Sequence, residues 1–305
     1  MPDISAMGID PEDIVRFVIA DFAPNLPAYN DRLMEYAVQL QRGPVNPDVM
    51  LIQGVKENAV SVVSTMFSHC SWHVSPNRTY HGYLNMTGVS RDFTLLDRSE
   101  IRMAGDHNPL DDIERPNDVL FCPDCLVDTF EVNGNKVRVY NYEAMRGPLF
   151  EVQRVYCASL ITRDAYRYLQ SRNGAEVLMY LGGDLHADAD FESVRLLTGK
   201  MTRKGVYPSA FTDVWPVMHK NSNDKGYTER ETDVFDSTVK LPKLIQPHRH
   251  TYFMVYGDAF GRIGTPLAIE INGNNVTDSM IPLSDDYGLT MDVWMPPEHE
   301  YISSE

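Results

Sequence analysis

Cysteine is scarce in this sequence, with four residues among 305. That number is too small, at this length, for a fold held together by disulfides. Long apolar runs are also missing: no stretch of about 18 consecutive apolar residues occurs, so the sequence predicts no transmembrane segment. Repeats, low-complexity tracts and long Pro/Gly/Ser-rich linkers are absent as well. We therefore expect one globular domain over residues 1–305.

Basic residues are few relative to acidic ones, 27 against 43, which gives a formal net charge of -16. This excess of negative charge disfavours non-specific binding to nucleic acid and docking on anionic membranes. The N-terminal sequence has neither the basic start and apolar run of a secretory signal peptide nor the arginines of a transit peptide. We therefore expect an intracellular, cytoplasmic protein that binds no nucleic acid.

Helices and strands alternate in the first third of the chain. The apolar run Ile14–Ala20 predicts a strand, and residues at three- and four-residue spacing predict a helix over Asn30–Gln41. Val49–Ile52 is a short apolar run of the kind that is buried on both faces of a sheet. A second helix is predicted over Glu57–Phe67. Helices between strands indicate an α/β protein.

The remainder of the chain adds hairpins and further strands. Asn133-Gly134 between two alternating segments is the strongest short signal for a β-hairpin. An amphipathic helix is predicted over Leu149–Arg172, followed by a buried strand that stops at Gly182. Further strands are predicted at 94–96, 119–121, 250–255, 267–271 and 289–294. The combination predicts mixed β-sheets.

Acidic residues stand where three apolar strands end or begin: Asp21, Asp184 and Asp285. Carboxylates at strand ends are exposed on loops yet held by a rigid sheet, which is how an oxygen-ligand site for Mg²⁺ is usually built. Asp is also common in turns, so each residue taken alone has an ordinary structural explanation. We take these three as the candidate metal ligands.

Four segments together resemble the motifs of the endonuclease/exonuclease/phosphatase superfamily, in the superfamily's order. Asp48–Val55 resembles its Asp-Val-x-x-Leu-Gln-Glu-Val box, and Val137–Glu143 its Val-x-Asn-Thr-His strand. Gly182–Asp188 resembles the Gly-Asp-Phe-Asn box, and Leu283–Gly288 the Ser-Asp-His box. The resemblance is closest to the neutral sphingomyelinase branch and is weak over about 68–118. It implies a four-layer α-β-β-α sandwich with two mixed β-sheets.

The resemblance also implies roles for individual positions, since superfamily members hydrolyse phosphate esters with Mg²⁺ and an activated water. Only Asp184 and Asp285 keep the residue of the family pattern. The other family positions carry different residues: Asp21 for Asn, Gly54 for the metal-binding Glu, Glu143 for His, His186 for Asn, Thr251 for Asp and Asp286 for the catalytic His.

These replacements remove chemistry that phosphodiester hydrolysis needs. Gly54 has no side chain and cannot ligate a cation, and the two lost imidazoles would have served as proton donors or bases near neutral pH. Glu143 and Asp286 place negative charge where a phosphate should sit, and like charges repel. We therefore expect a catalytically degenerate member of the superfamily that needs no cofactor and serves as a structural or protein-interaction component, with a protein partner or as a homo-oligomer.

A rebuilt active site is the main alternative, and a third hypothesis is a ligand- or ion-binding module that uses the same cleft without turnover. Asp21, Glu143, Asp184, His186 and the Asp285-Asp286 pair could converge as a carboxylate-rich cluster with one imidazole. Such a cluster would suit Mg²⁺, Mn²⁺ or Ca²⁺. The chain would then be a divergent metal-dependent phosphodiesterase, sphingomyelinase-like or phosphatase-like, with a lipid or phosphoester substrate.

Two further motifs have structural explanations. Cys122-Pro-Asp-Cys125 is a lone Cys-x-x-Cys, which Cys70, His69 and His73 could complete as a zinc site. Without a second cysteine pair, we expect reduced, structural cysteines. The segment His248–His250 is a local basic spot that we expect at a strand edge rather than in a metal site.

Overall fold

The computed structural model describes residues 8–22, 28–41, 46–77, 82–103, 123–171, 177–203, 207, 211–222, 224–228, 248–257, 263–273 and 287–297. Within these residues the helices are η2 (Pro11–Asp13), α1 (Tyr29–Gln41), η3 (Glu57–Ala59), α2 (Val60–Met66), η5 (Pro148–Phe150), α3 (Glu151–Ser171), α4 (Glu192–Leu197) and α5 (Val214–Met218). The strands are β1 (Ile14–Asp21), β2 (Val49–Val55), β3 (Cys70–Val74), β4 (Leu84–Ser90), β5 (Thr94–Ile101), β6 (Cys125–Val132), β7 (Asn135–Asn141), β8 (Leu178–Asp184), β9 (Phe211–Asp213), β10 (Thr251–Tyr256), β11 (Thr265–Asn272) and β12 (Gly288–Trp294).

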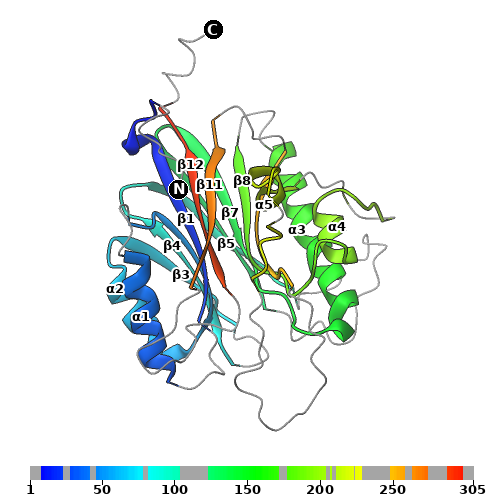
Figure 1. The fold of residues 1–305 in the computed structure, drawn as a ribbon, viewed down its shortest axis with the longest axis horizontal. Coiled ribbons are helices and arrows are strands. Elements are labelled where there is room, and N and C mark those ends of the chain that lie inside the picture. Colours follow the sequence, from blue (N-terminus) through cyan, green and yellow to red (C-terminus); the bar gives the residue numbers. More distant parts are fainter. Residues whose placement is uncertain are drawn as a thin grey trace.

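Two six-stranded sheets form the centre of the molecule (Figure 1). The first has the order β11-β12-β1-β2-β4-β3, and the second has the order β5-β6-β7-β8-β10-β9. Each sheet is mixed, because β1 and β2 run parallel in the first and β7 and β8 run parallel in the second, while the other pairs are antiparallel.

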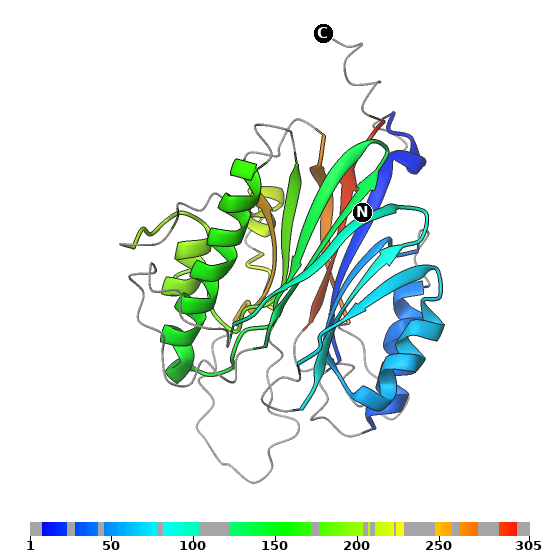
Figure 2. The same ribbon diagram turned by 180° about the vertical axis from the view of Figure 1, so that it is seen from behind.

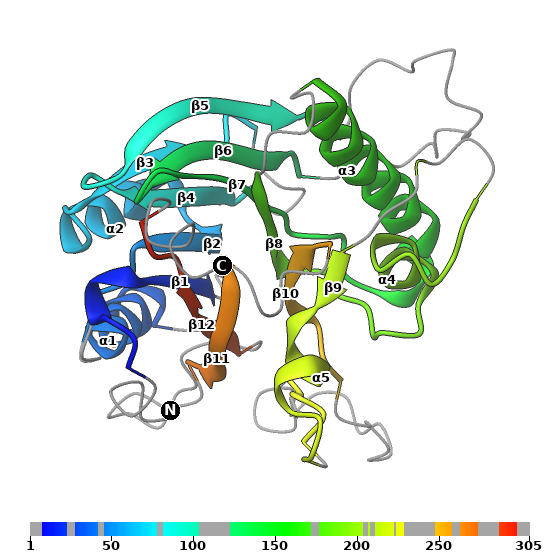
Figure 3. The ribbon, with the colours of Figure 1, turned by 90° about the horizontal axis from the view of Figure 1, so that it is seen from above.

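Helices cover the outer face of each sheet, so that four layers result. Viewed from above, α1 and α2 lie on one side of the paired sheets and α3 and α4 on the other (Figure 3). The view from behind shows the two sheets between the two helical layers (Figure 2). The predicted four-layer α/β sandwich with two mixed sheets is therefore confirmed.

Strand β1 shows why this sequence needs four layers. Phe17 and Ile19 point into the core between the sheets, while Val18 and Ala20 pack with α1. Successive side chains of a strand face opposite sides, so a strand that is apolar at every position must be covered on both faces. The core between the sheets and the two helix-facing cores satisfy that requirement.

The structure differs from the sequence prediction in two details. Strand β8 does not stop at Gly182 but continues to Asp184, because β10 pairs with it along that length, with Thr251 opposite Asp184. Strands β3 and β4 were not predicted as individual elements. The strand predicted at 119–121 lies outside the described residues.

Cys70, Cys125 and Cys157 are free and buried, while Cys122 lies outside the described residues. Burial raises the pKa of the Cys70 thiol to about 12, so it stays a neutral apolar group. In the described part of the chain, no helix combines the length and the apolarity that a membrane crossing requires.

Candidate functional site

A pair of glycines at the end of β8 brings the strand against the backbone that follows β7. Gly183 has φ +146°, and a Cβ atom there would lie 1.9 Å from the carbonyl oxygen of Tyr142. The main chain that follows β7 is hydrogen-bonded to β8 on both sides of Gly183. Tyr142 N–H donates to Gly182 O at 3.1 Å, and Ala144 N–H donates to Asp184 O at 2.7 Å. The close approach holds the segment with Glu143 beside the end of β8.

Asp184 ends β8 as a buried carboxylate, with 2% of its side chain exposed. Its Oδ1 accepts a hydrogen bond of 2.9 Å from the backbone N–H of His186, and His186 Nδ1 lies 3.3 Å from the same oxygen. His186 has φ 45°, in the left-handed region that Asn, Asp and His adopt more readily than other non-glycine residues. A tight turn therefore folds His186 back over Asp184.

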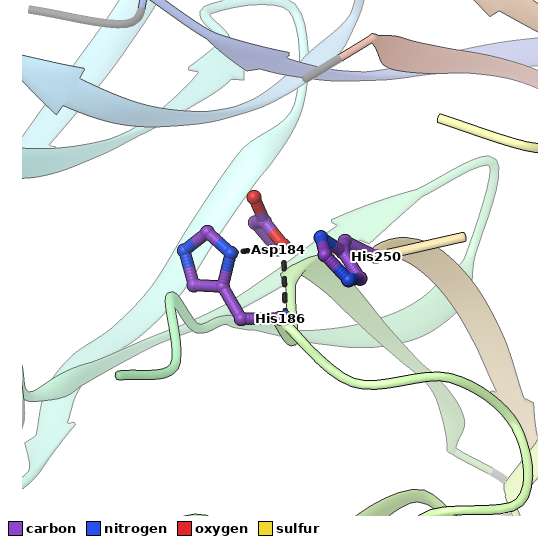
Figure 4. Close-up of side chains that lie close together, drawn as sticks. All are labelled: Asp184, His186 and His250. Atoms are coloured by element: carbon purple, nitrogen blue, oxygen red, sulfur yellow. Dashed lines mark hydrogen bonds and ion pairs between the residues drawn. The ribbon is translucent and has the colours of Figure 1, made fainter. Parts of the chain in front are cut away.

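His250 precedes β10, the neighbour of β8, and reaches the same place from the other side. Its carbonyl accepts from Leu185 N–H at 2.8 Å, and its own N–H donates to Thr228 Oγ1 at 2.8 Å. The rings of His186 and His250 lie 5.7 Å apart and nearly perpendicular. Figure 4 shows the two imidazoles on either side of Asp184. One potential ligand atom from each of the three residues lies within 4.8 Å of the other two.

The end of β2 supplies no side chain to this site. Gly54 has φ 70°, and the pairing of β2 with β4 shifts register between Ile52 and Val55. A glycine in the left-handed region at a register shift is typical of a β-bulge. The carbonyl of Gly54 accepts a hydrogen bond of 3.4 Å from Tyr29 OH. The position to which the motif resemblance assigns a metal-binding carboxylate is thus a backbone bulge.

Asp21 and Glu143 are half-buried and are not members of the three-residue group whose ligand atoms lie within 4.8 Å of one another. Asp21 ends β1, opposite Gln53 of β2, and Glu143 lies after β7. Among the described residues, only Asp184, His186 and His250 bring their ligand atoms together as a possible metal group. Asp285 and Asp286 lie outside the described residues.

This donor set does not fit Mg²⁺. Magnesium takes oxygen ligands in near-ideal octahedral geometry, usually carboxylates and water. In the described cluster two of three ligands are imidazoles, and Gly54 contributes no carboxylate. The two imidazoles are nitrogen ligands, which suit zinc, iron, copper or nickel instead.

A second acid–histidine pair borders the cluster. Asp188 accepts a hydrogen bond from His248 Nδ1 and a second, of 3.1 Å, from the backbone N–H of Arg249. The ring of His248 stacks on that of His250, with 5.8 Å between centroids. Arg249 is paired with the buried carboxylate of Asp213. The segment before β10 is therefore fixed by contacts on both sides of His250.

His250 is the site residue that the sequence interpretation left out. It directly precedes β10, and its ring joins Asp184 and His186, whereas the sequence interpretation expected this segment at a strand edge rather than in a metal site. The signal was the position of His250 directly before an apolar strand. The position of His250 predicts that it lies near Asp184 only when the pairing of β10 with β8 is known.

No protein-family model matches this sequence, and no curated protein does. Solved structures do match. TDP2 from Caenorhabditis elegans, in truncated form, superimposes with a TM-score of 0.68 and 15% identity over 92% of this chain and 98% of that one. The human Nocturnin catalytic domain with bound sulfate superimposes with a TM-score of 0.61 and 13% identity, over 93% of this chain and 96% of that one. An endonuclease/exonuclease/phosphatase protein from Bacteroides vulgatus superimposes with a TM-score of 0.59 and 14% identity, over 92% of this chain and 99% of that one.

The chain has the endonuclease/exonuclease/phosphatase fold. The coverage of both partners in each match means that the whole domain is shared, not one sheet of it. At these identities the likeness is one of fold. The closer resemblance to the neutral sphingomyelinase branch remains a prediction from the sequence motifs.

Proposed function

We propose that this protein uses the endonuclease/exonuclease/phosphatase fold without magnesium-dependent phosphodiester hydrolysis, as a structural or protein-interaction component. The observation that carries the proposal is Gly54. The motif resemblance assigns a metal-binding carboxylate to this position, and the residue present has no side chain and a backbone conformation that side chains rarely adopt. Loss of one member of a catalytic unit commonly removes several orders of magnitude of rate.

The charge around the site supports the same proposal. Asp184 is buried at the end of β8, and Glu143 is half-buried on the neighbouring segment. A phosphodiester carries negative charge and would need a cation or donors to offset these carboxylates. The net charge of -16 acts in the same direction on nucleic acid.

Exposed apolar side chains support an interaction role. Leu149, in η5, is 87% exposed, and Val152, three residues later at the beginning of α3, is 60% exposed. Leu95 and Leu96 are exposed on β5, which is an edge strand. Neighbouring exposed apolar residues and open strand edges are common features of protein-binding surfaces. A protein partner or a second copy of the chain is the proposed ligand of these surfaces.

A divergent hydrolase is the second candidate, and the cluster of Asp184, His186 and His250 is the observation that favours it. A metal ion held there could lower the pKa of a bound water and turn over a lipid or other phosphoester. This alternative differs from the first proposal in requiring turnover, which can be measured.

The test compares the wild-type protein with Asp184→Asn. Each would be assayed on sphingomyelin and on bis(4-nitrophenyl) phosphate, with Mg²⁺, Mn²⁺ or Zn²⁺ in turn. Asn at 184 keeps an oxygen for the His186 backbone N–H and removes the negative charge, so the fold should be retained. We expect the two proteins to give the same background rate. Metal-dependent turnover that Asp184→Asn abolishes would establish the hydrolase instead.

A further inference from the structure

We propose that Asp184, His186 and His250 form a binding site for one divalent first-row transition-metal ion, with zinc as its typical occupant. The site is distinct in chemistry from the oxygen-ligand magnesium site that the fold's motifs imply. It uses the end of β8, the turn after β8 and the residue before β10. The inference does not depend on whether the protein has a hydrolase activity.

The positions of the three ligands are fixed by main-chain contacts. Thr251, next to His250, is opposite Asp184 in the β8–β10 pairing. Leu185 N–H then donates to His250 O, so the residues that follow Asp184 and precede Thr251 remain bonded to each other. The Asp184–His186 turn is closed by its own 2.9 Å hydrogen bond. Little chain entropy is lost when such a site binds an ion.

The spacing of the ligand atoms suits a metal with short bonds. Two ligands at about 2.1 Å from a tetrahedral zinc ion lie roughly 3.4 Å apart. The three candidate atoms lie within 4.8 Å of one another. Side-chain rotations that move each atom by about an ångström would therefore bring them into coordination distance.

The ligand types select the class of metal. Two imidazoles and one carboxylate form the protein ligand set of several zinc hydrolases, and the same combination holds non-haem iron in oxygenases. Affinity of such a site generally increases along the first row toward copper, whereas Mg²⁺ binds nitrogen poorly. Three protein ligands leave one position open for water or another small ligand.

The surroundings of His250 are those of a ligand held in place. The stacked ring of His248 limits the rotation of the His250 ring from one side, and His248 is itself bonded to Asp188. Thr228 holds the His250 backbone. Groups that orient a ligand in this way commonly change metal affinity by about 10- to 100-fold when removed.

The experiment titrates the full chain, after treatment with a chelator, with Zn²⁺, Co²⁺ or Mg²⁺ chloride. Calorimetry would give the affinity and the number of ions per chain, and the visible spectrum of the cobalt form would report nitrogen ligation. We expect one zinc ion per chain and no comparable binding of Mg²⁺. His250→Gln and His186→Asn should each weaken zinc binding by at least about tenfold. Asn is chosen at 186 because it tolerates the left-handed backbone conformation.

His69→Gln is the matched control. His69 bonds to Pro47 O, just before the start of β2, whereas the cluster lies at the end of β8. This variant should bind zinc as the wild type does. Unchanged zinc affinity in either folded cluster variant, or Mg²⁺ binding as tight as that of Zn²⁺, would overturn the proposal. Two ligand variants are used so that a folding defect in one leaves the other informative.

The outcomes separate this inference from the proposed function. Zinc binding without turnover supports both. Zinc binding with phosphoesterase activity that His250→Gln abolishes supports the site and overturns the proposed function. Absence of zinc binding overturns the site and leaves the proposed function untouched.

Discussion

Gln53 of β2 donates a hydrogen bond of 2.6 Å to Asn141 of β7 and so joins the two sheets. Both side chains are fully buried. Asn141 in turn donates to Met86 O at 2.9 Å and to Thr87 Oγ1 at 3.2 Å, both on β4. A buried polar group without a partner is costly, so this arrangement fixes how β2, β4 and β7 sit together.

Replacing Asn141 with Leu should lower the free energy of unfolding by at least about 2 kcal/mol, because the Gln53 amide and the Met86 carbonyl would lose their buried partner. Urea denaturation measures the change. Asn58→Leu is the control, since Asn58 is exposed in η3 and its replacement should alter stability by no more than about 0.5 kcal/mol. Equal effects of the two substitutions would contradict the role given to Asn141.

His73 should make stability depend on pH. Its Nδ1 lies 3.0 Å from Asp128 and its Nε2 lies 3.1 Å from Glu100, so the protonated ring links β3 to the other sheet. Burial lowers the pKa of His73, but hydrogen bonds and charge from Asp128 and Glu100 outweigh it and raise the pKa above 6.5.

The stabilisation from His73 is thus fully present below pH 6.5 and is lost as pH rises through the higher pKa of the folded state. Urea unfolding at pH 6 and pH 8.5 should show that His73→Gln costs more at the lower pH. Arg98 also bonds Asp128, at 2.9 Å, so Asp128 retains one partner in the variant. A cost of His73→Gln that is independent of pH would refute the assignment.

Asp48 has the same sign of pH dependence as His73, in a lower pH range. Burial raises the pKa of this carboxyl from 3.8 to about 6, against a smaller lowering by the hydrogen bond from the Arg16 backbone N–H. A raised pKa means that the folded state holds the proton more tightly, so this contribution to stability is present below about pH 4 and is lost by about pH 6. Asp48→Asn should therefore gain stability relative to wild type between pH 4 and pH 7, by at most about 3 kcal/mol. Thermal or urea unfolding at these two pH values measures the gain, and a constant difference would rule out the titration of Asp48.

Gly183→Ala should damage the site and the fold together. The new Cβ would meet the Tyr142 carbonyl, a backbone atom that cannot move without disturbing β7 and β8. We expect a loss of more than about 2 kcal/mol in unfolding free energy. Gly82→Ala provides the comparison: Gly82 also has positive φ, but a Cβ there has no neighbour within 4 Å, so only about 1 kcal/mol of backbone strain is added. Similar losses in the two variants would show that contact with Tyr142 is unimportant.

Two valines of α3 should respond differently to the same substitution. Val152 is 60% exposed and Val155, one turn later, is 1% exposed. Val152→Ser should leave stability within about 0.5 kcal/mol of wild type, whereas Val155→Ser should cost more than about 2 kcal/mol. Denaturation of each variant measures this. If Val152 contributes to self-association, light scattering at high concentration will give a smaller mass for Val152→Ser than for the wild type. Equal masses would show that Val152 does not contribute to self-association.

The sequence predicted the elements whose signal is local. β1 and β2 are continuous apolar runs, α1 has helical spacing, and Asn133-Gly134 makes the hairpin between β6 and β7. β3 and β4 were not predicted, because β3 is half-buried and β4 carries polar residues such as Asn85 and Thr87. Thr87 has its side-chain partner, Asn141, in the opposite sheet, which local periodicity does not contain.

The same limit applies to the site. Asp184 and His186 could be identified because they lie two residues apart in a motif, and the structure brings them together. His250 is 64 residues beyond His186 and joins them only through the antiparallel pairing of β8 with β10. The bulge at Gly54 likewise depends on the partner strand, although its lack of a side chain was evident.

The hydrogen bond between Gln53 and Asn141 has a consequence for any ligand that binds near these two residues. Apolar contacts between two sheets are non-directional and permit small shifts of one sheet relative to the other. A buried hydrogen bond between the sheets has a preferred geometry and therefore favours one alignment. We therefore expect the spacing between β2 and β7 at this hydrogen bond to stay the same when a ligand binds. An ion or peptide that binds there has to fit that spacing, because its binding would not rearrange the two sheets.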